Sequence, residues 1–177
     1  MTNPTHVPAA RAAIDGAEPL PALQVAVCGP RECTERQADQ ARQVGELLAR
    51  AGAVVICGGG TGVMAAVAAG ARSAGGLVVG IRPGKDKDGA SPDLSVTIVT
   101  NLGEARNAVI VWSADAVIAV GCSWGTLSEI ALAKRRGDVP VVVLDGWHLT
   151  DESGAPVLGL THVDTPEKAV QEVLLTT

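Results

Sequence analysis

The chain has almost no aromatic side chains. Its 177 residues include no Phe and no Tyr, and apart from histidine its only aromatic rings belong to Trp112, Trp124 and Trp147. A hydrophobic core must therefore be built from Val, Ala, Leu and Ile. A chain of this length can bury about 70% of its unfolded surface, which predicts one domain around one sizeable core.

The chain also lacks an excess of positive charge. It has 14 Lys and Arg against 19 Asp and Glu, which gives a formal net charge of −5. Nucleic acids and anionic membranes are bound through basic surfaces, and single-stranded nucleic acids also through aromatic platforms. The composition therefore predicts that the protein binds neither nucleic acid nor a membrane.

Long hydrophobic runs are missing as well. Each apolar run breaks at Gly, Pro or a charge before reaching the roughly 18 residues that a bilayer span needs. Residues 1–21 contain no basic segment followed by an apolar one, as a secretory signal would. We expect a flexible N-terminal tail over 1–21, a single domain over 22–177, and a cytoplasmic location.

Neither the cysteines nor the histidines have the spacing of a metal site. No C-x-x-C pair is present, which argues against a zinc ribbon or a disulfide framework and favours reduced thiols. The histidines show no H-x-x-x-H or H-E-x-x-H spacing, so no metal site is predicted. These residues are Cys28, Cys33, Cys57 and Cys122, and His6, His148 and His162.

From residue 23 onward, short β-branched runs alternate with longer amphipathic stretches. Such alternation is typical of βαβ units and a parallel sheet. The expected strands are 23–28, 53–57, 77–81, 95–99, 114–121 and 140–144, and the expected helices are 34–50, 63–74, 103–113, 124–136 and 166–175. The sequence predicts an α/β fold with a doubly wound parallel sheet of six or seven strands in three αβα layers.

Glycine-rich turns follow three of the predicted strands. The carboxyl ends of parallel strands share one edge of a sheet, and each turn leads into a helix whose first amides and dipole favour an anion. Glycine lets the backbone approach such an anion closely, although plain strand-to-helix turns would look similar. The predicted ligand-binding residues of these turns are Gly29, Gly58, Gly59, Gly60, Thr61, Gly62, Ser123, Trp124, Gly125 and Thr126.

These turns do not match the common nucleotide-binding motifs. The turn over 58–62 lacks the G-x-G-x-x-G register with an acidic residue about 20 positions later. Neither this turn nor the turn over 121–126 has the lysine of a P-loop. NAD binding and ATP hydrolysis are therefore poorly supported. Trp124 could stack on a planar ring of the ligand, or it could be a packing anchor at the helix start.

Three segments in order resemble a known family. They are CGGGTGVMAAVAAGARSAGG (57–76), GEARNAVIVWSADAVIAVG (103–121) and WGTLSEIALA (124–133). The chain resembles the Rossmann-like superfamily of the LOG ("lonely guy") cytokinin-activating phosphoribohydrolases, whose members are often labelled lysine decarboxylases. Within it, the segments look most like the molybdenum-cofactor carrier proteins. The resemblance covers roughly residues 25–144 and implies a Rossmann-like fold.

The phosphoribohydrolases carry a PGGxGTxxE motif, which here reads GCSWGTLSE over 121–129. Gly125, Thr126 and Glu129 match, whereas the first three positions differ. Arg106 stands 23 positions before Glu129, where the family has its catalytic arginine, and Asn107 replaces the lysine that usually follows.

The resemblance implies that Arg106 holds the substrate and that Glu129 polarises the ribose or its attacking water. The residues alone leave other roles open for both side chains. Glu129, expected in the first turn of its helix, could serve as a structural cap, and Arg106 could form a plain surface salt bridge.

The loss of the Pro-Gly-Gly turn favours a binding or carrier protein for a phosphorylated ligand, either the molybdenum cofactor or another pterin, or a nucleotide. The alternative is a phosphoribohydrolase that cleaves the N-glycosidic bond of a nucleoside 5′-monophosphate. Pyridoxal phosphate is not expected because it needs a Schiff-base lysine. The lysines lie elsewhere: Lys85 and Lys87 in the polar, Gly- and Pro-rich segment 82–93, Lys134 at a helix end and Lys168 in the last helix.

Two further expectations concern the thiols and the oligomer. Cys28, Cys57 and Cys122 all follow or end strands at the proposed site and could be soft ligands, or simply small buried side chains. The apolar run 109–112 (VIVW) is broad enough to face both the sheet and a partner, which predicts a homodimer or a higher homo-oligomer.

Overall fold

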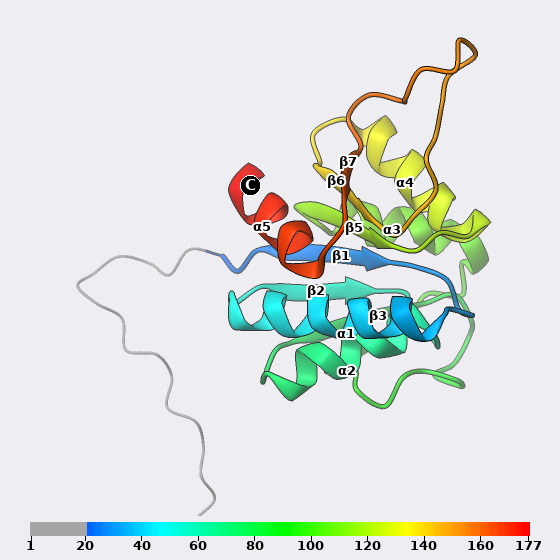
Figure 1. The fold of residues 1–177 in the computed structure, drawn as a ribbon. Coiled ribbons are helices and arrows are strands. Elements are labelled where there is room, and N and C mark those ends of the chain that lie inside the picture. Colours follow the sequence, from blue (N-terminus) through cyan, green and yellow to red (C-terminus); the bar gives the residue numbers. More distant parts are fainter. Residues whose placement is uncertain (1–20) are drawn as a thin grey trace, which may run out of the picture.

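Seven parallel strands form one sheet in the order β4-β3-β2-β1-β5-β6-β7. This arrangement is seen in a computed structural model that describes residues 21–177 (Figure 1). The predicted fold class is thereby confirmed. The predicted tail over 1–21 lies outside the described residues except for its last position, and the domain boundary at 22 stays a prediction.

Six of the seven strands were located by the sequence analysis, and the structure adds a seventh. Six strands, β1 to β6, lie where the sequence predicts them, whereas β7 is a short edge strand that the sequence analysis did not locate. The strands are β1 (Gln24–Cys28), β2 (Val54–Cys57), β3 (Val78–Arg82), β4 (Val96–Val99), β5 (Ala116–Val120), β6 (Val141–Leu144) and β7 (Thr161–Val163).

The helices also follow the prediction, with one difference. The stretch expected as a single helix over 103–113 divides into a short 3-10 turn (Gly103–Ala105) and the helix α3. The helices are α1 (Glu35–Arg50), α2 (Val63–Ser73), α3 (Arg106–Trp112), α4 (Trp124–Arg136) and α5 (Pro166–Thr176). None of these helices is long and apolar enough to cross a membrane within the described residues.

The sheet lies between two layers of helices (Figure 1). Helices α1, α2 and α5 pack on one face, and α3 and α4 pack on the other. Alternate residues of β1 enter the two cores, Val25 and Val27 on the first side and Ala26 and Cys28 on the second. Because both faces of the central strands are covered, their sequences are almost wholly apolar.

Local signals fix where the helices start. Thr34 caps α1 in a reciprocal arrangement: its hydroxyl accepts the Gln37 N–H at 3.2 Å, while the Gln37 side chain accepts the Thr34 N–H at 3.1 Å. Thr165 caps α5 with Pro166 at the first helical position, as predicted. These starts place the first turns of the helices at the carboxyl edge of the sheet.

Two helices on the same face pack through glycines. A Cβ atom at Gly45 of α1 would overlap the backbone of Val67 in α2, and one at Gly70 of α2 would overlap the backbone of Arg42 in α1. The backbones of α1 and α2 are therefore in direct contact. This close packing fixes the position of α2, whose first residues follow the first glycine turn.

Candidate functional site

A cavity of about 550 Å³ opens at the carboxyl edge of the sheet. Its walls come from the loop after β1, the first glycine of the turn after β2, the start of α3, and the loop and first turns after β5. Strands β1 and β5 are neighbours, and the chain leaves them toward opposite sides of the sheet. Such a switch point is where open α/β sheets bind their ligands.

The structure brings seven of the predicted site residues into this cavity and leaves five outside its walls. The lining residues are Gly29, Gly58, Arg106, Ser123, Gly125, Thr126 and Glu129. The five outside are Gly59, Gly60, Thr61, Gly62 and Trp124. Whether any of them binds a ligand stays a prediction.

The turn after β2 is glycine-rich because it packs against other protein segments. A Cβ atom at Gly58 would lie 2.7 Å from Nη1 of Arg106, and one at Gly62, where φ is +64°, would overlap the backbone carbonyls of Pro30 and Arg31. The first amide of α2, on Val63, already donates to the Pro30 carbonyl at 3.1 Å. This turn therefore supports the cavity and offers fewer free amides than its glycines suggest.

The start of α4 is the more open helix terminus. Ser123 is the N-cap, and its hydroxyl accepts the Thr126 N–H at 3.2 Å and lies 3.0 Å from the Thr126 hydroxyl. The backbone N–H groups of Trp124 and Gly125 have no partner within residues 21–177. The start of α4 therefore offers two unpaired amides and the positive end of a helix dipole next to the lining residues Ser123 and Thr126.

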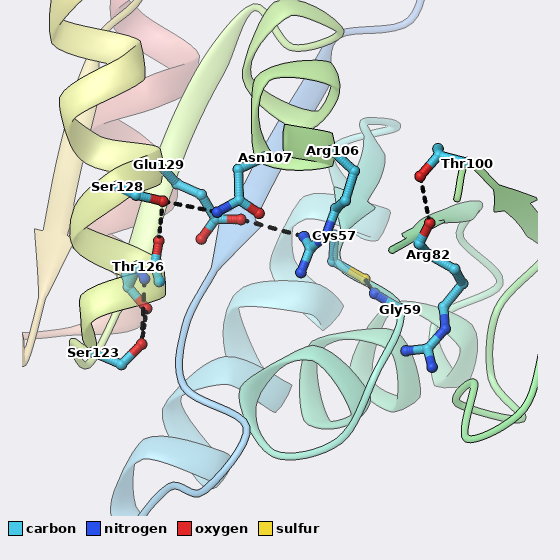
Figure 2. A network of polar contacts seen from close by, with 11 residues as sticks. Cys57, Gly59, Arg82, Thr100, Arg106, Asn107, Ser123, Thr126, Ser128 and Glu129 are labelled. Carbon is cyan, nitrogen blue, oxygen red and sulfur yellow. Dashed lines mark hydrogen bonds and ion pairs between the residues drawn. The ribbon is translucent and has the colours of Figure 1, made fainter. Parts of the chain in front are cut away.

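Arg106 and Glu129 form a buried ion pair. Arg106 Nη1 lies 3.6 Å from Glu129 Oε1, and the side chains are only 6% and 8% exposed. Figure 2 shows the two side chains pointing toward one another from α3 and α4. The sequence left open a surface salt bridge for Arg106 and a capping role for Glu129, and both alternatives are wrong. The ion pair is buried. Glu129 lies in the second turn of α4, and Ser123 is the residue that caps this helix.

The ion pair does not satisfy the guanidinium. Nε and Nη1 of Arg106 are buried and have no hydrogen-bond partner among the described residues. A buried charge that lacks hydrogen bonds is costly, because it has lost its hydration without replacement. Because Arg106 also lines the cavity, an anionic ligand bound there would gain from this unsatisfied guanidinium.

Asn107, the neighbour of Arg106, is fixed to α4. Its side-chain amide donates to the Ser128 hydroxyl at 2.8 Å, and that hydroxyl donates to the Gly125 carbonyl at 2.8 Å (Figure 2). The Asn107 Oδ1 atom is buried without a partner in the described part of the chain. Asn107, which lines the cavity, thus links the two helices and keeps one buried acceptor without a partner among the described residues.

Burial raises the pKa values of Glu129 and of two thiols at this edge of the sheet. Desolvation raises the pKa of Glu129 from 4.5 to about 7, against an opposing effect of Arg106. Burial also raises the pKa of Cys28 well above its usual range, with Glu129 adding to the effect, and raises that of Cys57 to about 11. These two thiols are therefore not thiolates at neutral pH.

The cavity also contains residues that the sequence analysis did not select. Pro30, Arg31 and Glu32 come from the loop after β1, and Met64 comes from the first turn of α2. Their signal in the sequence was only their position after a strand. Across residues 21–177, no group of three or more His, Cys, Asp or Glu side chains is arranged to hold a metal ion.

Comparison with known proteins identifies relatives over most of the chain. The model of the SLOG cluster4 family matches residues 22–170. An uncharacterized protein of Archaeoglobus fulgidus is 43% identical over 153 residues, which cover 84% of this chain and 92% of that protein. The cytokinin riboside 5′-monophosphate phosphoribohydrolase of Mycobacterium tuberculosis is 34% identical over 128 residues, which cover 68% of each protein.

Two solved structures share the fold over nearly their whole length. The molybdenum cofactor binding protein from Rippkaea orientalis superimposes with a TM-score of 0.79 at 32% identity, covering 89% of this chain and 98% of that one. The molybdenum cofactor carrier protein from Chlamydomonas reinhardtii superimposes with a TM-score of 0.77 at 28% identity, covering 88% and 98%. The predicted resemblance is confirmed, and the chain belongs to the SLOG cluster4 family.

Proposed function

We propose that the protein binds and carries a phosphorylated small molecule, either the molybdenum cofactor or another pterin, or a nucleotide. The observation that carries this proposal is the buried guanidinium of Arg106, two of whose nitrogens lack hydrogen-bond partners among the described residues. A phosphate in the cavity would be held by this guanidinium and by the amides of Trp124 and Gly125.

The comparisons support a pterin with a phosphate as one ligand. Two solved structures, at 32% and 28% identity, are described as proteins that bind or carry the molybdenum cofactor. The cavity, at about 550 Å³, falls in the size range of small-molecule sites. Cys28 and Cys122 line the cavity, and the pKa of each thiol is raised. We therefore do not expect either thiol to bind the molybdenum of the cofactor as a thiolate.

Glu129 takes a supporting role in a carrier. With a pKa of about 7, the carboxyl group holds its proton in about half of the molecules at neutral pH. A nearby phosphate would favour the protonated form further, because two negative charges at close range repel. Protonated Glu129 donates a hydrogen bond, so it does not oppose an anionic ligand as a carboxylate would.

A phosphoribohydrolase is the second candidate. The favouring observation is that Arg106 and Glu129 face each other within one cavity, as the resemblance requires of a substrate-holding arginine and a catalytic glutamate. The relative from Mycobacterium tuberculosis adds support at 34% identity. Against it stand the GCS sequence over 121–123 and Asn107 in place of lysine.

We also propose a homo-oligomer that forms through α3 and the β4 edge of the sheet. Of the run 109–112, Ile110 and Val111 are buried, whereas Trp112 is 65% exposed. The register places Val96 and Ile98 of β4 on the same face as the α3-facing residues of β3, and both are about half exposed. This apolar surface, extending past the short helix α3, suits a second copy of the chain.

Binding measurements on two variants separate the carrier from the enzyme. Guanosine 5′-monophosphate is a suitable probe because guanine shares its aminopyrimidinone ring with pterins. In a carrier, Arg106→Ala loses charge-assisted hydrogen bonds worth about 1.5–3 kcal/mol and binds roughly 10- to 100-fold more weakly by calorimetry, while Glu129→Ala changes affinity much less. Arg135→Ala, at the exposed far end of α4, serves as the control.

A phosphoribohydrolase would give a different result for wild type and Glu129→Ala. Wild type would release free base steadily, and Glu129→Ala would abolish this release while retaining affinity, because a group that acts in the transition state affects turnover rather than binding. Such a result would overturn the carrier proposal.

The stability of the protein is expected to depend on pH through Glu129. Its pKa is higher in the folded state, at about 7, than the ordinary 4.5, so its stabilising contribution is full below pH 4.5 and is lost as the pH rises through 7. Glu129→Gln stays neutral at every pH. It should match wild type in urea unfolding at about pH 4.5 and exceed it by about 3 kcal/mol or less at pH 8.

The control is Glu152→Gln, which removes an exposed acid from the loop between β6 and β7. A Glu129→Gln effect of equal size at both pH values would contradict the raised pKa.

Light scattering tests the oligomer. At micromolar concentration the wild type should have the mass of a dimer or a larger assembly, and Ile98→Glu combined with Trp112→Glu should reduce it to a monomer, because charges in an apolar interface are desolvated without a partner. Leu158→Glu, on a different exposed segment, should leave the mass unchanged. A monomeric wild type would contradict the proposal.

A further inference from the structure

Two of the three tryptophans stand together beside the cavity. Trp124 and Trp147 meet edge to face, with ring centroids 5.2 Å apart and an interplanar angle of 76°. Trp124 is the first residue of α4, and Trp147 follows β6 in the loop toward β7. In a chain without Phe or Tyr, this pair is the only contact between two indole rings in the described residues.

Packing does not account for Trp124. Its side chain is 78% exposed and belongs to neither of the two hydrophobic cores, so it is not the anchor that a tryptophan at a helix start often is. Trp147 is 42% exposed. A large ring held in place by a second ring, yet left open to solvent, is typical of a surface that receives another group.

The position of the pair links it to the cavity. Trp124 lies between Ser123 and Gly125, both of which line the cavity, and it carries one of the two free amides of the α4 terminus. The backbone of Trp147 lies against the thiol of Cys122, another lining residue. The two rings therefore adjoin the place where the phosphate of the proposed ligand would bind.

We propose that Trp124, supported by Trp147, is the stacking platform for a planar heteroaromatic ring of the ligand. This inference rests on the proposed function and narrows it: the ligand combines a phosphate, held by Arg106 and the α4 terminus, with a flat ring that lies on the indole. Stacking is tolerant of ring identity, because every heteroaromatic base has a π-face. Trp124 then determines specificity for ring-bearing phosphates over simple ones.

The test compares two ligands that differ in the ring alone. Ribose 5-phosphate and guanosine 5′-monophosphate are titrated by calorimetry into wild type and variants. Trp124→Ala should weaken guanosine 5′-monophosphate about tenfold and change ribose 5-phosphate by less than twofold, because stacking on an aromatic side chain is lost. Trp124→Phe should recover most of the affinity, and Leu158→Ala, an exposed apolar truncation, should match wild type.

Fluorescence gives a second measurement that does not depend on affinity. In a Trp112→Phe background, the remaining emission comes from Trp124 and Trp147 alone. Saturating guanosine 5′-monophosphate should quench it, and saturating ribose 5-phosphate should not.

The possible outcomes distinguish a failure of the proposed function from a failure of the stacking platform alone. If wild type binds neither ligand, the proposed function fails, and this inference fails with it. If wild type binds both ligands and Trp124→Ala weakens neither, or weakens both equally, the phosphate site stands and the stacking platform is wrong. In that case the tryptophan pair serves another purpose, such as contact with a second protein.

Discussion

A buried guanidinium at the carboxyl edge of the sheet governs the rest of the site. Arg106 comes from the short helix α3, and its charge is balanced by one acid, Glu129, at a distance too long for a hydrogen bond. Gly58 has no side chain at the point where a Cβ atom would meet the guanidinium. The same poorly hydrated surroundings raise the pKa values of the neighbouring Glu129 and Cys28.

This imbalance explains why the cavity is suited to an anion although the whole chain is acidic. A net charge of −5 gives no long-range attraction for a phosphate. Attraction must therefore come from short-range groups: the unsatisfied nitrogens of Arg106 and the free amides at the start of α4. The guanidinium is effective because burial has already removed its hydration, so binding a phosphate there removes little further water.

The sequence predicted the fold well and the site only in part. Alternating apolar and amphipathic segments reveal βαβ units, since both faces of a parallel sheet are covered, but β7 is three residues long and half exposed and leaves no such pattern. Glycine content identified the turn after β2 without revealing that Gly62 is there to clear Pro30 and Arg31. Contacts of this kind depend on segments distant in sequence, which local patterns do not encode.

The protonation and hydrogen bonding of the site could not be predicted from the sequence either. The resemblance to a known family paired Arg106 with Glu129, yet their burial, the protonation of Glu129 and the missing partners of Arg106 follow only from the packing of α3 against α4. The structure adds the physical reason for the proposal that this pair binds a phosphate. Trp147 has no signal in the sequence at all, because its partner Trp124 lies on a different element.

Mass spectrometry of the small molecules released from natively purified protein tests the central claim most directly. We expect a phosphorylated compound with a planar heteroaromatic ring, present in wild type and strongly depleted in Arg106→Ala purified in parallel. Release of an unphosphorylated compound, or of the same compound in equal amounts from Arg106→Ala, would contradict the account, because the buried guanidinium would then not hold the ligand.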